Sequence, residues 1–170
     1  YQDVILDDIV KALTLPFEQS MFYFNMRYEL GSGFGYGTGP LFQCDNDKLK
    51  NACKEFPDIL PERFAEMCPV CNFINDETTM EFSDFFIWLV NNYGDNEKVL
   101  QSLSSNFGTY SYIGVGSMKG YYMNRQNMFK PLLVHENPKV ADWAKNMYKT
   151  EEREVNYQQM IDDYKDMTKN

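Results

Sequence analysis

Four cysteines are the residues of this chain best suited to redox or metal chemistry. They are Cys44, Cys53, Cys68 and Cys71, and the last two belong to a Cys-Pro-Val-Cys motif. In a redox dithiol the first cysteine normally opens a helix that follows a strand, where the peptide dipoles lower the thiol pKa. Here Cys68 is predicted to end a helix and to precede a polar connector over residues 72–79. The pattern therefore does not indicate a thioredoxin-type activity.

A structural zinc site is the second chemistry that these cysteines could support. Such sites usually combine two close pairs of ligands, and only one pair is close in this sequence. Cys53 follows Leu49 by four residues and Cys68 follows Phe64 by four, so both thiols are expected on apolar helix faces. Buried thiols are the favoured interpretation. A zinc-stabilised module that uses all four cysteines is kept as an alternative.

The remaining reactive groups form no recognisable catalytic set. His135 is the only histidine and is expected in a turn, with no nucleophile motif to accompany it. The glycine-rich stretch 31–40 lacks the preceding strand and the following lysine of a phosphate-binding loop. Adjacent carboxylates such as Asp7 and Asp8 diverge around a helix instead of sharing a proton. We therefore expect no cofactor and no enzyme activity.

A second glycine- and tyrosine-rich stretch, residues 106–117, leads into the strongest candidate for a protein interface. The whole chain has a net charge of −9, but residues 101–136 hold three basic residues against one acid. Tyrosine and arginine are enriched among residues that dominate binding at interfaces. The candidate residues are Tyr110, Tyr112, Lys119, Tyr121, Tyr122 and Arg125. Core packing of these rings is the alternative, and an enzyme site within the two long loops is another.

Helices are predicted for the elements that would position these residues. The apolar periodicity gives helices over residues 3–13, 17–30, 80–93 and 120–134, with a strand over 21–28 as the alternative for part of the second. Asp45 or Asn46 is expected to cap a further helix that Pro57 stops, and Pro61 to open a short one that Pro69 ends. Residues 80–93 are apolar on nearly every side, so Phe85 and Trp88 are expected to be buried.

Two short polar turns are predicted to join helices into hairpins. In the first, Gly94 is expected in the left-handed conformation, and Asp95 or Asn96 caps the helix whose inward face holds Val99, Leu100 and Leu103. In the second, Asn137 is a cap and Pro138 a first-turn proline. The last helix is expected to carry one apolar stripe over residues 140–147 and a second at Tyr157, Met160, Ile161, Tyr164 and Met167, with its end projecting.

Composition and charge restrict the class of protein. A chain of 170 residues with 44% hydrophobic and 16% aromatic residues is long and apolar enough to fold. The net charge of −9 argues against general nucleic-acid binding, and no apolar run is long enough to cross a membrane. Because the chain starts at Tyr1 without a methionine, we expect it to be part of a larger protein, with a processed secreted protein as the alternative. Residues 1–170 are predicted to form one helical-repeat domain with loose halves 1–72 and 79–170.

The two joints resemble HEAT-type helical repeats. The resemblance lies in Tyr93–Leu103 and in Pro131–Ala144, where an aliphatic helix end, a short Asn/Asp or Asn-Pro turn and a helix opening on valine follow one another. Residues 80–148 are most similar to the terminal repeats of large bacterial HEAT-repeat proteins. The resemblance implies an all-α stack of antiparallel helical hairpins, here with two long Gly/Tyr-rich loops. It further implies a non-enzymatic scaffolding domain of a larger cytoplasmic bacterial protein, with a protein partner and no shared catalytic residues.

Overall fold

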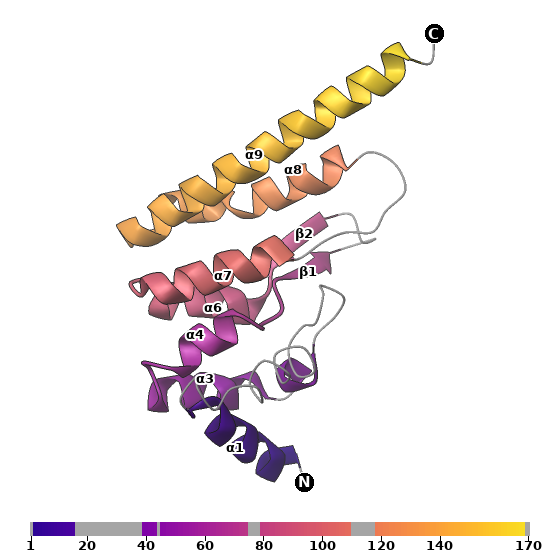
Figure 1. Ribbon diagram of the computed structural model, residues 1–170. Helices are drawn as coiled ribbons and strands as arrows, with labels where there is room; N and C mark the ends of the chain where they lie inside the picture. Colours follow the sequence, from indigo (N-terminus) through magenta and orange to yellow (C-terminus); the bar gives the residue numbers. More distant parts are fainter. Residues whose placement is uncertain (1, 16–38, 44, 75–78, 110–117, 169–170) are drawn as a thin grey trace. The chain divides into compact units, whose positions relative to one another are not determined.

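The protein is mostly helical, as the sequence predicts (Figure 1). The computed structural model describes residues 2–15, 39–43, 45–74, 79–109 and 118–168. The expected helix over 17–30 and most of both glycine-rich stretches lie outside these ranges. The elements are α1 (Gln2–Leu13), η2 (Pro40–Gln43), α3 (Asn46–Glu55), α4 (Leu60–Ala65), β1 (Cys71–Ile74), β2 (Thr79–Phe82), α6 (Asp84–Tyr93), α7 (Glu97–Thr109), α8 (Lys119–Met128), η3 (Lys130–Val134) and α9 (Pro138–Met167).

The chain divides into two compact units. The first contains residues 1–71 and 82–111, and the second contains residues 72–81 and 112–170. Helices α6 and α7 therefore belong with the N-terminal helices, whereas the sequence suggested loose halves at 1–72 and 79–170. Within the first unit, α4 packs against both α6 and α7. No helix in the described ranges is both long enough and apolar enough to cross a bilayer.

Helices α3 and α4 begin and end close to where their caps and prolines predict. The Asp45 carboxylate accepts a hydrogen bond from the Asp47 backbone N–H at 2.9 Å, so Asp45 is the cap of α3. This helix ends at Glu55, before Pro57, and Pro61 lies in the first turn of α4. Helix α4 is shorter than expected because it ends at Ala65. Cys68 is buried beyond its end and not on its face.

The predicted polar connector over residues 72–79 is wrong, because β1 and β2 form a two-stranded sheet there. Residues Thr79–Phe82 alternate between exposed and buried positions, with Met80 and Phe82 buried. This period of two is the signal of a strand, but the same apolar residues also fit the start of a helix. Helix α6 instead begins at Asp84, because the Ser83 hydroxyl accepts a hydrogen bond from Phe86 N–H at 3.2 Å and caps it.

The core of the first unit is an aromatic cluster around α6. Phe85 is 2% exposed and its ring lies edge-on to Phe42, at 5.2 Å between centroids, and to Phe64, at 6.0 Å. The predicted burial of Phe85 is confirmed. Trp88 is less completely buried than Phe85, because its indole lies at the edge of the cluster between Phe85 and Tyr93.

The turn between α6 and α7 differs from its prediction at one residue. Gly94 has φ −66° and ψ −10°, so it continues the right-handed turn and is not left-handed. Asn96 is the cap of α7, since its side-chain oxygen accepts a hydrogen bond from the Lys98 N–H at 3.0 Å. The helix then continues to Thr109, so the stretch expected to be a loop from residue 106 starts as helix. Phe107 within it is buried.

One polar side chain joins α7 to the end of α4. The buried Asn106 amide donates hydrogen bonds to the Ala65 carbonyl at 3.0 Å and the Cys68 carbonyl at 2.8 Å. Carbonyls at a helix C-terminus have no partner within the helix. Asn106 therefore satisfies backbone groups that would otherwise be buried without one of their hydrogen bonds.

In the second unit, the helix predicted over residues 120–134 is interrupted. Helix α8 ends at Met128 and residues 130–134 form the 3₁₀ helix η3, with Pro131 in its first turn. Proline has no N–H to continue an α-helix and its ring clashes with the preceding turn. Met123 of α8 is 44% exposed, whereas Met128, Phe129 and Leu132 are buried. The start of α9 is as predicted, because Asn137 accepts a hydrogen bond from Lys139 N–H at 2.9 Å and Pro138 is the first helical residue.

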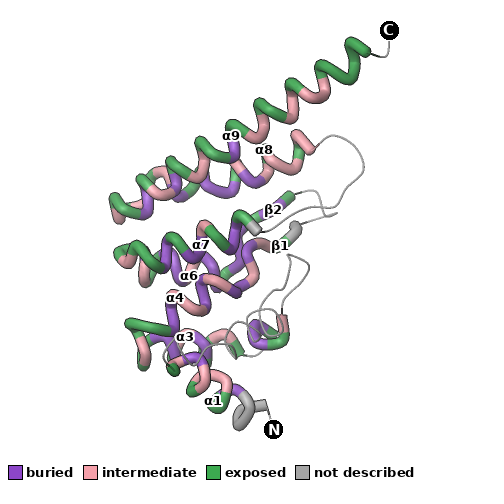
Figure 2. The backbone as a smooth tube through the Cα atoms, viewed as in Figure 1, coloured by how far each residue is buried: buried purple, intermediate pink, exposed green. Residues whose placement is uncertain are grey.

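Burial follows one face of α9 in its first half only (Figure 2). Val140, Ala141 and Ala144 are buried, and the Trp143 ring contacts buried Phe129 at 5.6 Å between centroids. After Glu151 no residue of this helix is buried. The second half of α9 therefore exposes most of its surface.

We predict that Phe85→Ala lowers the free energy of unfolding by about 3–5 kcal/mol, because a buried aromatic ring is removed from a close-packed cluster. Chemical denaturation measures this value. Val134→Ala is the control, because Val134 is 85% exposed and its loss is expected to change stability by no more than about 0.5 kcal/mol. Equal effects of the two substitutions would contradict the assigned core.

Asn106→Ala is expected to destabilise the protein by about 1–3 kcal/mol, because two buried carbonyls lose a donor. The same substitution at exposed Asn127 on α8 removes no buried hydrogen bond and should be neutral or slightly stabilising. Comparing the denaturation midpoints of the two variants tests the role of the amide. A neutral Asn106→Ala variant would show that other donors satisfy these carbonyls.

Candidate interaction surface

Four of the six residues proposed from the sequence as an interface lie on α8, and one of them, Arg125, is buried. Arg125 is 5% exposed and Glu151 of α9 is 3% exposed. The guanidinium donates two hydrogen bonds to the carboxylate, from Nε to Oε2 at 2.7 Å and from Nη2 to Oε1 at 3.0 Å. This two-point geometry is the strongest that arginine makes with a carboxylate. Arg125 is therefore part of the packing between α8 and α9 and presents no accessible charge.

Two tyrosines of α8 complete the surroundings of this guanidinium. Arg125 Nη1 donates a hydrogen bond to the Tyr121 hydroxyl at 3.0 Å, and its Cζ lies 5.5 Å from the Tyr121 ring centroid and 6.0 Å from that of Tyr122. The two rings are edge-on to each other at 5.3 Å. Burial alone lowers the pKa of Arg125, but the hydrogen bonds and charge of Glu151, with the Tyr121 contact, outweigh it and raise the pKa.

Lys119 makes a second polar contact between the two helices. Lys119 lies about one turn before Tyr122 on α8, and its ammonium donates a hydrogen bond to the side-chain oxygen of Gln159 on α9. Tyr121, Tyr122 and Lys119 are each half-buried. Tyr110 and Tyr112 lie outside the described residues. Of the six predicted interface residues, the structure thus brings four together on α8, with Arg125 at the buried centre; their role at an interface stays a prediction.

The cysteines are placed separately from this cluster. Cys53 on α3 and Cys68 after α4 are buried, as the favoured interpretation predicts, and burial raises the pKa of Cys53 to about 12. Cys71, on β1, is half-buried, and Cys44 lies outside the described residues. Over the ranges that the structure covers, no three His, Cys, Asp or Glu side chains are grouped to hold a metal ion. His135 lies in the turn before α9, where its Nδ1 accepts a hydrogen bond from Asn137 N–H at 3.0 Å.

The largest exposed apolar group of the described chain lies on the second half of α9. Four side chains share it: Tyr157 (57% exposed), Met160 (69%), Tyr164 (66%) and Met167 (71%). Their spacing of three, four and three residues places them on one side of the helix. We call them the tip stripe. The sequence pattern contained this stripe, but it was not among the predicted interface residues.

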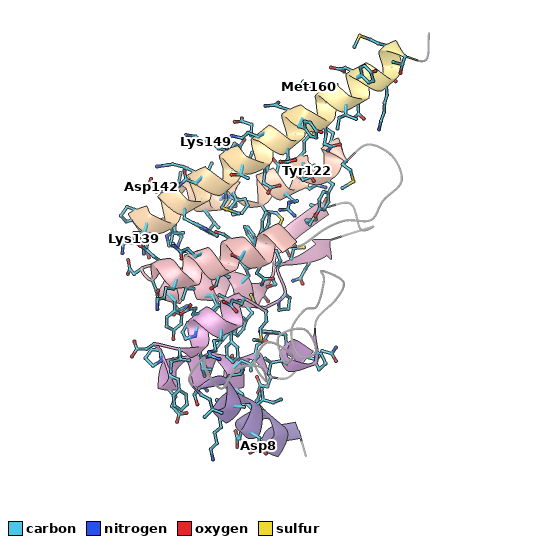
Figure 3. The ribbon with its side chains drawn as sticks, viewed as in Figure 1. Asp8, Tyr122, Lys139, Asp142, Lys149 and Met160 are labelled. Atoms are coloured by element: carbon cyan, nitrogen blue, oxygen red, sulfur yellow. The ribbon has the colours of Figure 1, made fainter. Side chains whose placement is uncertain are left out.

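The tip stripe faces away from α8. An α-helix turns by about 100° per residue, so Met160 lies roughly 180° around α9 from Glu151, which marks the side packed on α8. The half-buried residues Gln158, Gln159 and Asp162 continue the packed side. Figure 3 shows Met160 on the side of α9 away from Tyr122. Helix α9 therefore has one side that holds the unit together and another that is uncovered.

Comparison with known proteins identified no protein similar to this chain. No protein-family model matches the chain, and neither curated proteins nor solved structures give a match.

We predict that Arg125→Met destabilises the protein by about 3–5 kcal/mol, because it leaves the Glu151 carboxylate buried without its partner. The double variant Arg125→Met/Glu151→Leu should recover most of this loss, since an apolar pair of similar size replaces the ion pair. Thermal and chemical denaturation of both variants measure the difference. Arg153→Met is the control, because Arg153 is an exposed arginine of α9, and it should be close to neutral. Additive losses in the double variant would contradict the pairing.

Proposed function

We propose that this chain is a non-enzymatic protein-interaction domain whose binding surface includes the tip stripe of α9. The observation that carries the proposal is the exposure of Tyr157, Met160, Tyr164 and Met167 in one row opposite the packed side of the helix. Contiguous apolar groups on a folded protein are commonly binding sites. Tyrosine and methionine are enriched at interfaces, where methionine adapts its shape to the partner.

The packing of the second unit supports a recognition role for this half of the helix. The first half of α9 is held by α8 and η3, and the Arg125–Glu151 pair fixes its rotation. The second half is a direct continuation of that held segment. A partner that binds it would not have to order a flexible segment first, which reduces the entropy lost on association.

The wider assignment is a scaffolding domain with HEAT-like stacked hairpins, part of a larger cytoplasmic bacterial protein. Its support is the pair α6 and α7, joined only by residues 94–96 and packed against each other and α4, together with the Asn-Pro joint before α9. Joints of this kind are typical of stacked helical repeats. The role of Tyr110, Tyr112, Lys119, Tyr121 and Tyr122 as a further binding surface belongs to the same proposal.

The test compares capture of partners by two variants with the same charge change. Met160→Glu/Tyr164→Glu adds two charges to the tip stripe, and Gln101→Glu/Asn127→Glu adds two at exposed positions elsewhere. We expect both to fold normally, because exposed substitutions rarely change stability by more than about 0.5 kcal/mol. The tip variant should lose a partner captured from the source cell by at least about tenfold, as expected for central interface residues.

Quantitative mass spectrometry of the captured proteins measures this difference, with circular dichroism to confirm equal folding. The control variant should retain the partner at the wild-type level. Equal capture by the two variants, or no stoichiometric partner for the wild type, would overturn the proposed function.

A further inference from the structure

The uncovered side of α9 also gathers most of the positive charge of the helix. Within roughly 70° of the direction of Met160, helical geometry places Lys139, Lys145, Lys149 and Arg153, all of them exposed. Figure 3 shows Asp142, Lys149 and Met160 following one another along the same edge of the helix. We call Lys145, Lys149 and Arg153 the basic row; it precedes the tip stripe on the same side.

This arrangement separates the charges of α9 by side. The helix has five basic and seven acidic residues. Within roughly 70° of Met160 lie four of the basic residues and two acids, Asp142 and Asp163, and the exposed Glu152 lies just outside this sector, at about 80°. Asp142 is already paired with Lys145, at 2.9 Å between Oδ1 and Nζ, and Asp163 accepts a hydrogen bond from Gln159 at 2.6 Å. This sector is thus net positive by two charges, or by one when Glu152 is included, on a chain whose net charge is −9.

We propose that this side of α9 binds an acidic amphipathic segment of a partner protein, an inference that rests on the interaction function proposed above. Apolar side chains of the segment pack on the tip stripe, and its carboxylates face the basic row. Complementary charge of this kind sets the orientation of a partner and accelerates its association. Residues 145–167 span about 33 Å, so a partner helix of about 22 residues covers both rows.

A second copy of the chain fits this surface poorly. Two copies in parallel place Lys149 and Arg153 against the same residues, and a full antiparallel overlap places them against the apolar tip stripe. An antiparallel overlap of the tips alone joins only two heptads, whereas a self-standing coiled coil needs three to four. A membrane surface is also disfavoured. Helices that lie on membranes flank their apolar residues with Lys and Arg, but Asp162, Asp163 and Asp166 accompany the tip stripe.

The experiment uses the full chain and two designed fluorescent peptides. Each is a 22-residue helix with leucines that match the tip stripe; one has glutamates opposite the basic row and the other has lysines at those positions. Fluorescence anisotropy measures binding to the wild type, Lys149→Glu/Arg153→Glu and the control Lys54→Glu/Lys98→Glu, whose residues are exposed on other helices. We expect the acidic peptide to bind the wild type and the control, and the row variant to bind it at least about tenfold more weakly, a change of about 1.4 kcal/mol.

Each other outcome overturns the inference. These outcomes are stronger binding of the lysine peptide, equal binding of the acidic peptide to the row and control variants, or no binding up to about 100 µM. Binding to anionic lipid vesicles, or a dimer in analytical ultracentrifugation that Met160→Glu dissociates, would assign the surface to a membrane or a second copy. Capture of a partner that depends on Met160 but not on Lys149 and Arg153 would overturn this inference alone. Loss of the Met160 dependence itself would overturn the proposed function as well.

Discussion

The ion pair between Arg125 and Glu151 decides which side of α9 is turned toward α8. Both groups are buried, and a carboxylate without its guanidinium would be strongly unfavourable there, so the helix cannot rotate without breaking the pair. The positions of the other residues follow from this constraint. Val140 and Ala144 pack inward on the same side as Glu151, and the residues half a turn away face outward.

The net stability that such a pair supplies is small compared with an apolar replacement, because both charges lose their hydration. Its main consequence is therefore the register between the helices. The α8–α9 contact ends close to the Lys119–Gln159 hydrogen bond, since α8 begins there. Beyond this point α9 has no α8 residue opposite it, and the apolar side chains of its last turns have no packing partner within α8.

The sequence predicted the helix ends that depend on local chemistry. Asp45, Asn96, Asn137 and the prolines at 57, 61 and 138 act within a few residues of the chain, so their effect can be read from the pattern. Some local signals were misjudged, since Pro131 interrupts the helix predicted over 120–134 and Gly94 is right-handed. Other failures occurred where the outcome depends on distant residues. Met80 and Phe82 satisfy the helical period and the strand period equally, and pairing with β1 decides between them. Arg125 looked like a surface charge because its partner, Glu151, is 26 residues away.

Only part of the candidate surface was predicted from the sequence, because its position also depends on how residues distant in the sequence pair. Residues of α8 were chosen because tyrosine and arginine are frequent at interfaces, but the pairing with α9 takes Arg125 into the packed side. Four of the five residues of the stripe predicted on α9 are exposed, whereas the fifth, Ile161, is half-buried. Its separation from the packed side could not be derived from spacing alone, because that requires knowing which residues α8 covers.

The two sides of α9 differ in what their residues must satisfy. On the packed side a substitution has to preserve volume and the buried charge balance, as the Arg125–Glu151 pair requires. On the uncovered side Lys149, Arg153 and Met160 have no such requirement within the described chain, so this surface can change composition with little effect on stability. Nevertheless it holds apolar groups at helical spacing and four of the five basic residues of the helix. The proposed binding of an acidic segment rests on this combination of exposed apolar groups and positive charge, which the packing of α8 against α9 does not require.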